Sequence, residues 1–244
     1  MTVALLMTMA ALAAPAFAQI PEEFTNLKVL PEDIPQRELV TIMRGFTRAL
    51  GVRCSTCHVG EEDQDLSEYD FASDDEATKR TAREMIKMVQ SINENVVVTL
   101  ADRGSPEIEV TCVSCHAGRR RPTTLVQELT WAVEEGGSEA MIARYHELRG
   151  RYYGFGALDF GPRALDEVVG GLLRADDLPG ASAAVHLNLE FHPESADSWA
   201  LKGQVHMRAD QTDEAIAALE KSLEIFPQNP RVQRVLDRLK AGGG

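Results

Sequence analysis

The chain has 244 residues, of which 44% are hydrophobic and 26% are charged, a composition typical of a folded globular protein. Its 25 Lys and Arg against 38 Asp and Glu give a net charge of −13, which argues against nucleic acid as a partner, because phosphate binding needs clustered basic residues. Four cysteines are too few for a dense disulfide scaffold.

The first 18 residues are uncharged and form an apolar run that ends in Ala16, Phe17 and Ala18. Small residues at the first and third places of that triplet are typical of a secretory cleavage site. We therefore expect a signal peptide over residues 1–18 and an exported protein, periplasmic or extracellular. A buried helix or membrane anchor is the alternative, but the run is short for a span. No later stretch is apolar enough to cross a bilayer, so no membrane span is expected after cleavage.

Two amphipathic helices are predicted in the first half of the chain. In the first, apolar residues recur at three- and four-residue steps up to a plausible stop at Gly51: Leu39, Ile42, Met43, Phe46 and Leu50. The second begins at about Thr78, with one apolar stripe: Ala82, Met85, Ile86, Val89 and Ile92. Val96–Val98 is the best strand candidate, or else it prolongs this helix. Strand-like alternation is otherwise scarce, so the chain is predicted to be all-α.

The segment between these helices, Glu61–Glu76, holds nine acidic residues and no basic one. We expect it to form an exposed loop. Such a loop can steer a basic redox partner by long-range attraction, although a solvated loop without a docking role is the more common case.

Two pentapeptides, Cys54-Ser55-Thr56-Cys57-His58 and Cys112-Val113-Ser114-Cys115-His116, use all four cysteines. Both have the C-x-x-C-H pattern by which c-type haem is attached. Two thiols so spaced can add to the two vinyl groups of one porphyrin, and the adjacent histidine then supplies a nitrogen ligand to the iron. We therefore expect two covalently bound haem c groups. Their predicted thioether anchors are Cys54, Cys57, Cys112 and Cys115, and their proximal ligands are His58 and His116.

Other uses of a C-x-x-C pair fit less well. A redox-active pair would need a thioredoxin-like βαβ pattern, which the sequence lacks. A zinc site could take the thiols but would leave the paired histidines unexplained. Disulfides that close such small rings are disfavoured by geometry.

An electron-carrying haem needs a second axial ligand, usually Met or His. Met43 lies on the apolar stripe of the helix before the first motif, and Met85 and Met88 lie on the helix before the second. Core packing is the alternative role for each methionine. Of the histidines outside the motifs, His146 is a minor candidate, and the others are expected to be surface or packing residues: His186, His192 and His206.

Between Phe24 and Pro122 lie the runs FTNLKVLP, IMRGFTRALGVRCSTCHVG, and TAREMIKMVQSIN followed by VTCVSCHAGRRRP. In these runs the chain resembles the cytochrome subunit of photosynthetic reaction centres, built from units of a helix, a turn and C-x-x-C-H. The sixth ligand in that family is typically a methionine of the helix. The resemblance implies Met43 for the first haem and Met85 for the second, with Met88 as the alternative to Met85. Because the chain has two such motifs, it implies a dihaem relative and leaves the photosynthetic role open.

The second half of the chain contains no cysteine. Leu125–Val133 and Met141–Leu148 are predicted to form a helical hairpin around Gly136 and Gly137. An internal period of 34 residues follows, and it separates Ala181 from Ala215 and Pro193 from Pro227. This period and the large and small residues within it are typical of tetratricopeptide repeats, and 231–240 is predicted to form a solvent-facing capping helix. The predicted domains are a dihaem cytochrome domain (19–122), a hairpin connector (123–160) and a tetratricopeptide domain (161–244).

Several basic residues near the motifs are candidate partners of haem propionates: Arg53, Arg80, Arg83, Arg119, Arg120 and Arg121. Lys79 is expected to be ordinary solvated surface. No nucleophile–base pair, phosphate loop or paired-carboxylate site stands out.

The sequence therefore predicts an electron-transfer protein and not an enzyme. Its expected partners are redox proteins and copies of itself held by the repeats. A dihaem peroxidase and an assembly module of a larger cytochrome complex or polymer are the alternatives. The peroxidase would need one iron with an open or displaceable ligand.

Overall fold

A computed structural model describes residues 20–21 and 23–242, so the expected signal peptide lies outside the described residues. The chain divides into two compact units, one ending at Arg120 and the other beginning at Arg121. Over the described ranges every regular element is helical, and an isolated bridge between Val59 and Asp70 takes the place of a sheet. The all-α prediction is confirmed. No helix among these residues is both long and apolar enough to traverse a bilayer.

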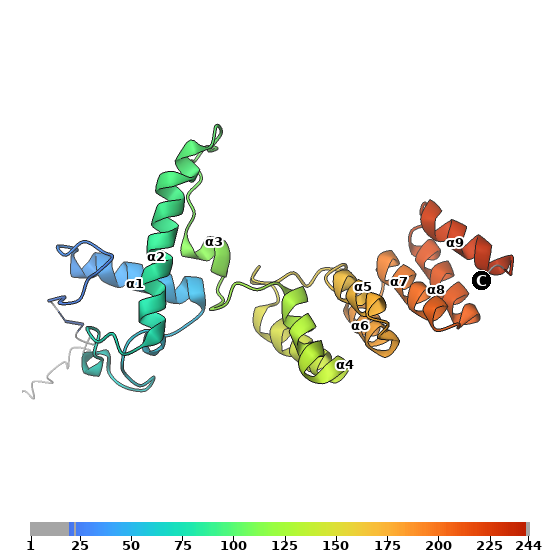
Figure 1. Ribbon diagram of the computed structural model, residues 1–244, viewed down its shortest axis with the longest axis horizontal. Helices are drawn as coiled ribbons and strands as arrows, with labels where there is room; N and C mark the ends of the chain where they lie inside the picture. The colour runs from blue at the N-terminus through green and yellow to red at the C-terminus, as the bar shows by residue number, and fades with distance from the viewer. Residues whose placement is uncertain (1–19, 22, 243–244) are drawn as a thin grey trace, which may run out of the picture. The chain divides into compact units, whose positions relative to one another are not determined.

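The first unit contains two long helices, α1 (Gln36–Leu50) and α2 (Ala77–Asn95), which cross one another in Figure 1. The apolar stripe predicted for α1 ends where expected, since Gly51 caps the helix with a φ of 63°. That left-handed conformation suits a residue without a side chain. Short 3₁₀ turns follow at η1 (Cys54–Thr56) and η2 (Leu66–Glu68).

The stretch that follows α2 is helical and not extended. Val97–Thr99 forms the 3₁₀ turn η3, so the second reading of Val96–Val98, as a prolongation of the helix, is the correct one. The described part of the chain offers no neighbouring strand to pair with an extended segment, and backbone groups of β-branched residues then find partners within a turn. The unit ends with the short helix α3 (Cys112–His116).

The second unit begins with α4 (Leu125–Tyr152), whose backbone is broken at Gly136 and Gly137. Gly137 has a φ of 67°, which glycine adopts without strain. The break folds the chain back, because Arg144 Nη2 lies 2.5 Å from Glu128 Oε2. In a straight helix two residues 16 positions apart would be separated by about 24 Å. The element is therefore a hairpin of two helices.

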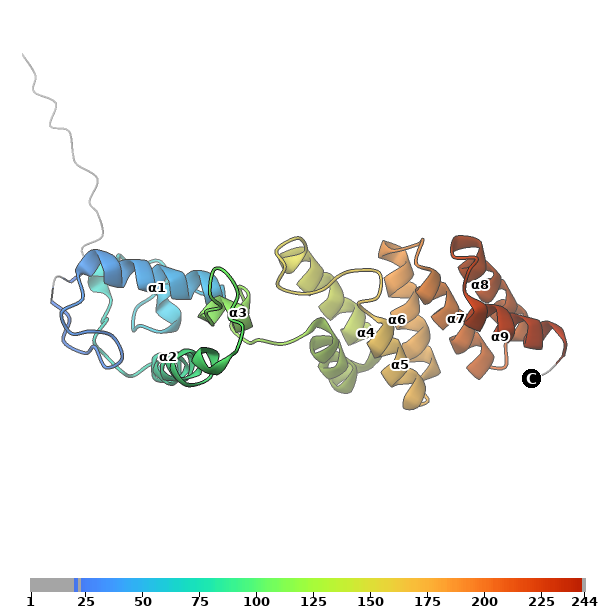
Figure 2. The same ribbon diagram turned by 90° about the horizontal axis from the view of Figure 1, so that it is seen from above.

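Five further helices pack in succession against one another, as the stacked ribbons of Figure 2 show. They are α5 (Asp166–Arg174), α6 (Leu178–Phe191), α7 (Ala196–Arg208), α8 (Thr212–Ile225) and α9 (Pro230–Lys240). Ala181 and Ala215, which the sequence period relates, are both fully buried between neighbouring helices. The buried side chains of α4, α5 and α6 form one continuous apolar core. These are the helical hairpins of tetratricopeptide repeats.

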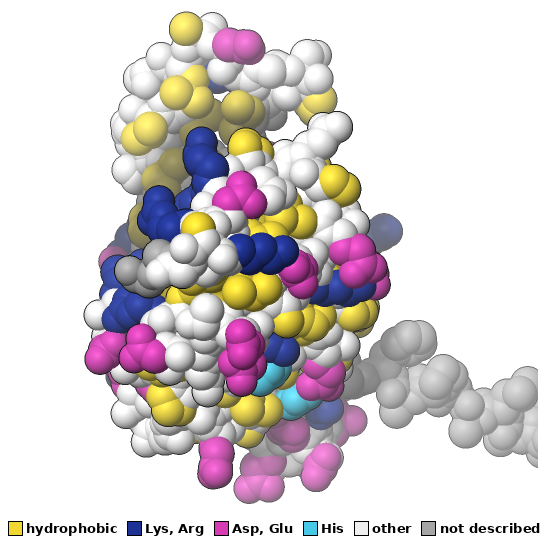
Figure 3. All heavy atoms as spheres, turned by 90° about the vertical axis from the view of Figure 1, so that its right-hand side faces the viewer, with side chains coloured by type: hydrophobic (Ala, Val, Ile, Leu, Met, Phe, Trp, Pro, Cys, Tyr) yellow, Lys and Arg dark blue, Asp and Glu magenta, His cyan; other side chains and the backbone are white. Residues whose placement is uncertain are grey.

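The last helix, α9, covers the end of this stack. Val232 and Leu236 are buried against Leu219 of α8, and Arg231, Arg234 and Arg238 lie exposed on the outer face. On the face seen in Figure 3, basic and acidic side chains are interspersed. A mixed surface of this kind keeps the end of the stack solvated and does not by itself mark a binding site.

Candidate haem sites

The first cysteine motif forms one tight helical turn immediately after α1. The backbone N–H groups of Cys57 and His58 both donate to the carbonyl of Cys54, at 3.1 and 3.0 Å. A turn of this kind places residues three and four apart on the same side. It therefore brings the Cys57 thiol and the His58 ring to the side on which Cys54 lies, as a single porphyrin requires.

The second motif is the helix α3 itself. Ser114 Oγ accepts a hydrogen bond from the Thr111 backbone N–H at 3.0 Å, which fixes the start of the turn. Ala117 then adopts a left-handed conformation with φ 47°, and the chain turns away directly after His116. Cys112 and His116 are half-buried and Cys115 is exposed.

Backbone contact joins the two motifs. The N–H of Gly118 donates to the carbonyl of Ala49, the last buried residue of α1, at 2.9 Å. A Cβ atom at Gly51 would overlap the carbonyl oxygen of Gly118. The end of the helix that leads into the first motif therefore touches the turn that follows the second, and only glycine allows this approach.

A largely apolar cavity of about 650 Å³ lies within the first unit, between α1, α2 and the segment that precedes α1. Seven of the predicted haem-site residues line it: Met43, Cys54, Cys57, His58, Met85, Cys112 and His116. Cys115 and Met88 do not line it. Most of the apolar stripe of α1 and the first part of the stripe of α2, Ala82 to Ile86, line this cavity, so the cavity takes the place of a core between these parts of the helices. A flat apolar group would satisfy both faces.

A hydrogen bond orients the His116 ring. Its Nδ1 lies 2.9 Å from the carbonyl oxygen of Arg119. Since a carbonyl only accepts, Nδ1 carries the proton in the neutral ring, and Nε2 keeps its lone pair. A carbonyl partner of this kind orients most metal-binding histidines.

The His58 ring is half-buried and packs edge-on against Phe71, with 5.0 Å between the ring centroids. Burial, and then the positive charges of Lys79 and Arg83, hold the pKa of His58 below its ordinary value. The ring is therefore neutral at pH 7, which is the state that binds iron. Its Nδ1 is buried without a hydrogen-bond partner.

The donor set suits covalent haem. All four cysteines are free thiols. Burial raises the pKa of Cys57 and of Cys112, so both stay protonated at neutral pH. Within the described residues no three His, Cys, Asp or Glu side chains are grouped so as to hold a metal ion. Single histidines beside paired thiols and an apolar cavity fit a macrocycle that brings its own nitrogen ligands.

The methionines differ in where they lie. Met43 is half-buried and lines the cavity from α1. Met85 and Met88 are 44% and 46% exposed, and of these two Met85 lines the cavity. The assignments of Met43 and Met85 as iron ligands stay predictions.

The expectation that Lys79 is solvated surface is wrong, because Lys79 is 8% exposed and lines the cavity. Among the candidate propionate partners, Arg53, Arg83 and Arg120 line the cavity, whereas Arg80 lies outside it. The sequence held a signal for Lys79, which lies one helical turn before Arg83 on the same side of α2. The four remaining histidines all belong to the second unit, and none of them lines the cavity.

The acidic segment 61–76 is not wholly solvent-exposed. Tyr69 is buried, stacks on Phe71 and donates from its hydroxyl to the carbonyl of Glu61 at 2.6 Å. Thr78 donates to the Thr56 carbonyl, which ties the start of α2 to the first motif. The loop thus forms part of the cavity wall.

Two parts of the chain match the profiles of known protein families. The profile of the family described as photosynthetic reaction centre cytochrome C subunit matches residues 9–162, beyond Pro122 and through α4. A tetratricopeptide-repeat profile matches residues 196–236. A solved structure, the first tetratricopeptide domain of Spaghetti bound to an HSP90 peptide, is similar at 15% identity and a TM-score of 0.34. The matched region covers 48% of this chain and 89% of the chain in that structure. The two profiles stand in the order that the sequence predicts.

Proposed function

Since this chain belongs to the photosynthetic reaction centre cytochrome C subunit family, we propose that it is an exported dihaem c-type cytochrome that carries electrons one at a time between redox partners. The observation that carries the proposal is that residues of both C-x-x-C-H motifs and two methionines line one shared cavity of the first unit. Bound haem supplies reversible one-electron chemistry at its iron.

The residues have separate tasks. Cys54 and Cys57 would anchor the first haem through thioether bonds, and the neutral ring of His58 would supply a nitrogen ligand to its iron. Met43, on the helix that leads into this motif, would supply a sulfur ligand. The apolar walls of α1 and α2 exclude water, which favours a rigid coordination and little reorganisation as the charge on the iron changes.

At the second site Cys112, Cys115 and His116 have the same tasks, with Met85 as the sixth ligand. The Arg119 carbonyl orients the His116 ring. The backbone contact between the two motifs keeps the haem sites in one compact unit, which favours electron exchange between them. The repeats of the second unit offer a surface for partner proteins or for further copies of the chain.

The direct test is the haem content of the exported protein. Purified from the periplasm or the medium of a host that attaches haem c, the chain is expected to carry two covalent haems and to show two one-electron steps in a redox titration. Haem content is measured by absorbance of the reduced pyridine adduct against protein mass. Any other stoichiometry, or protein retained in the cytoplasm with its leader, contradicts the proposal.

Replacement of the axial methionines by leucine tests the ligand assignment. Met43→Leu and Met85→Leu are each expected to remove about half of the methionine-to-iron charge-transfer band of the oxidised protein, because each removes the sulfur ligand of one iron. Met88→Leu is the matched control on α2, since Met88 does not line the cavity, and it should leave the band intact. A loss of the band in Met88→Leu but not in Met85→Leu would reverse the assignment.

A further inference from the structure

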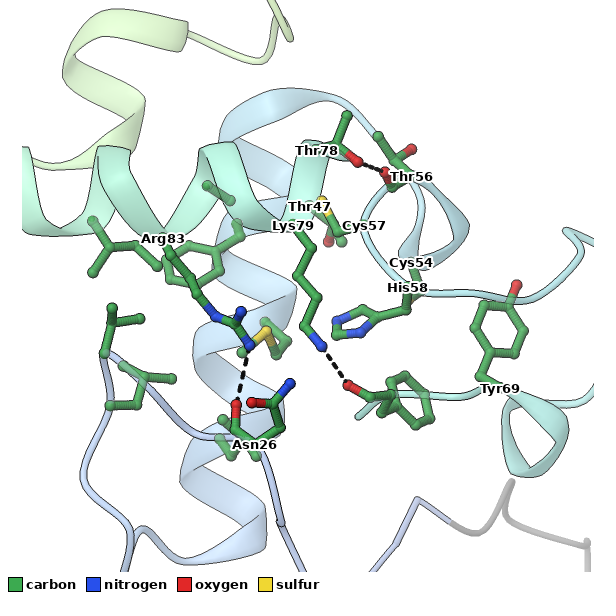
Figure 4. Close-up of a pocket in the computed structure, with 18 of the residues that line it drawn as sticks. Asn26, Thr47, Cys54, Thr56, Cys57, His58, Tyr69, Thr78, Lys79 and Arg83 are labelled. Carbon is green, nitrogen blue, oxygen red and sulfur yellow. Dashed lines mark hydrogen bonds between the residues drawn. The ribbon is translucent and has the colours of Figure 1, made fainter. Parts of the chain in front are cut away.

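One wall of the cavity is polar and positively charged. It is formed where α2 meets the segment before α1 and the end of the acidic loop (Figure 4). Five residues gather at this wall and are here called the Asp74 cluster: Asn26, Lys28, Asp74, Lys79 and Arg83. All of them except Asp74 line the cavity.

The Asp74 carboxylate is the centre of this cluster. Lys28 Nζ lies 2.6 Å from Oδ2, and Arg83 Nη1 and Lys79 Nζ lie 2.7 and 3.3 Å from Oδ1. Lys28, and then Arg83 and Lys79, hold the pKa of Asp74 far below its ordinary value, so the carboxylate is ionised. Three cations thus share one anion within the cluster, which is net positive.

Much of this surplus charge is buried. The side chains of Lys79 and Arg83 are 10% and 12% exposed. Burial lowers the pKa of Lys79, the expected effect when a charge is withdrawn from water without full compensation. Asp70 also faces Lys79 and offsets part of its charge, while its Oδ1 accepts from the backbone N–H groups of Ala72 and Ser73. A buried charge surplus of this kind calls for an anion.

The cluster retains hydrogen-bond donors for that anion. Lys79 Nζ is fully used, because it donates to the carbonyls of Phe71, Ala72 and Ser73 at 2.6–3.1 Å. Arg83 donates to Asp74 and to the Asn26 carbonyl, which leaves three of its five N–H groups. Lys28 donates only to Asp74 and is 55% exposed. Figure 4 shows Arg83 extending from α2 to Asn26, and the Lys79 side chain ending beside the His58 ring.

We infer that the Asp74 cluster binds the two propionate carboxylates of the haem attached to the first motif, with Arg83 and Lys28 as the donors. This inference rests on the proposed function. The cluster lines the same cavity as Cys54, Cys57 and His58, it is net positive, and Arg83 and Lys28 retain donors that a carboxylate accepts. Lys79 is a positioning residue, which ties the loop at Phe71–Ser73 to α2. The porphyrin is thereby oriented with its vinyl edge at the cysteines and its carboxylate edge at α2.

Charge-neutralising variants of the full chain test the inference. Arg83→Gln and Lys28→Gln each remove a positive charge beside one haem and so favour its oxidised state. In a redox titration we expect one of the two steps to move to lower potential while the other stays in place. For Arg83→Gln the ratio of oxidised to reduced haem at fixed potential should rise about tenfold, which is about 59 mV for one electron.

Arg80→Gln is the matched control, because it makes the same charge change three residues earlier on α2, at an exposed side chain that does not line the cavity. It should move neither step by more than a small fraction of that shift. Two results overturn the inference, provided that the variants still bind two haems. One is an equal shift of redox potential in Arg80→Gln, and the other is no shift of potential in either Arg83→Gln or Lys28→Gln. Absence of covalent haem from the unmodified protein overturns the proposed function instead. Lys28→Gln decides the question if Arg83→Gln fails to fold, since Lys28 is largely at the surface.

Discussion

Gly51→Ala is expected to destabilise the first unit by about 3–5 kcal/mol, because two costs fall on the same atom. Gly51 has a φ of 63°, a conformation that alanine adopts only with strain. Its new Cβ would also meet the backbone carbonyl of Gly118, which cannot rotate away as a side chain would. Relief requires α1 to separate from the turn after α3, and that separates the two haem motifs.

The effect is measured by urea denaturation of the haem-loaded protein, followed by the haem absorbance. Gly45→Ala is the matched control within the same helix, since a Cβ at Gly45 has open space around it. It should stabilise α1 by about 0.5–1 kcal/mol, the usual gain from alanine in place of a helical glycine. Equal stabilities for Gly51→Ala and the unmodified protein would contradict the backbone contact between the motifs.

Removal of both thiols of the first motif is expected to halve the covalent haem. In the double variant Cys54→Ala, Cys57→Ala no thioether can form at this site, and the His58 ring alone binds iron too weakly to retain haem through denaturing purification. One haem per chain and one redox step should remain, both from the second motif. Haem staining after denaturing electrophoresis and the pyridine adduct measure this loss.

Two further variants make this test specific. Cys112→Ala with Cys115→Ala should also leave one haem, now at the first motif, so the two double variants identify the two redox steps separately. Ser55 lies between the paired cysteines, and the control variant Ser55→Ala should retain both haems. A chain that keeps two haems without Cys54 and Cys57 would contradict the assignment of the first site.

Much of the fold is predictable from local sequence pattern. The stripe of α1, its stop at Gly51 and the 34-residue period of the repeats each arise from interactions within a few turns, and these elements lie where the pattern indicates. The hairpin at Gly136 and Gly137 is likewise local, because a glycine pair interrupts an otherwise helical run. The C-x-x-C-H motifs are predictable for a chemical reason, since spacing alone allows two thiols and a histidine to serve one porphyrin.

The Asp74 cluster shows where such reasoning ends. Lys79 reads as a surface residue in a charged run, and it is buried because loop carbonyls 71–73 and Asp74 fold over its ammonium group. Those partners come from another segment, and no periodicity within α2 encodes them. Met85 and Met88 cannot be distinguished from the sequence for the same reason. Both are exposed residues of α2, and only the tertiary fold makes Met85, and not Met88, line the cavity.

The cavity between α1 and α2 bears on how the protein matures. The second unit has a closed apolar core of its own, whereas α1 buries only Leu39 and Ala49 in the first. The repeats can therefore fold around that core alone, whereas the interior of the first unit contains a large apolar cavity that bound haem would fill. Under the proposed function, haem attachment is then the last folding step of the first unit, and chains that miss it expose an apolar interior to proteolysis.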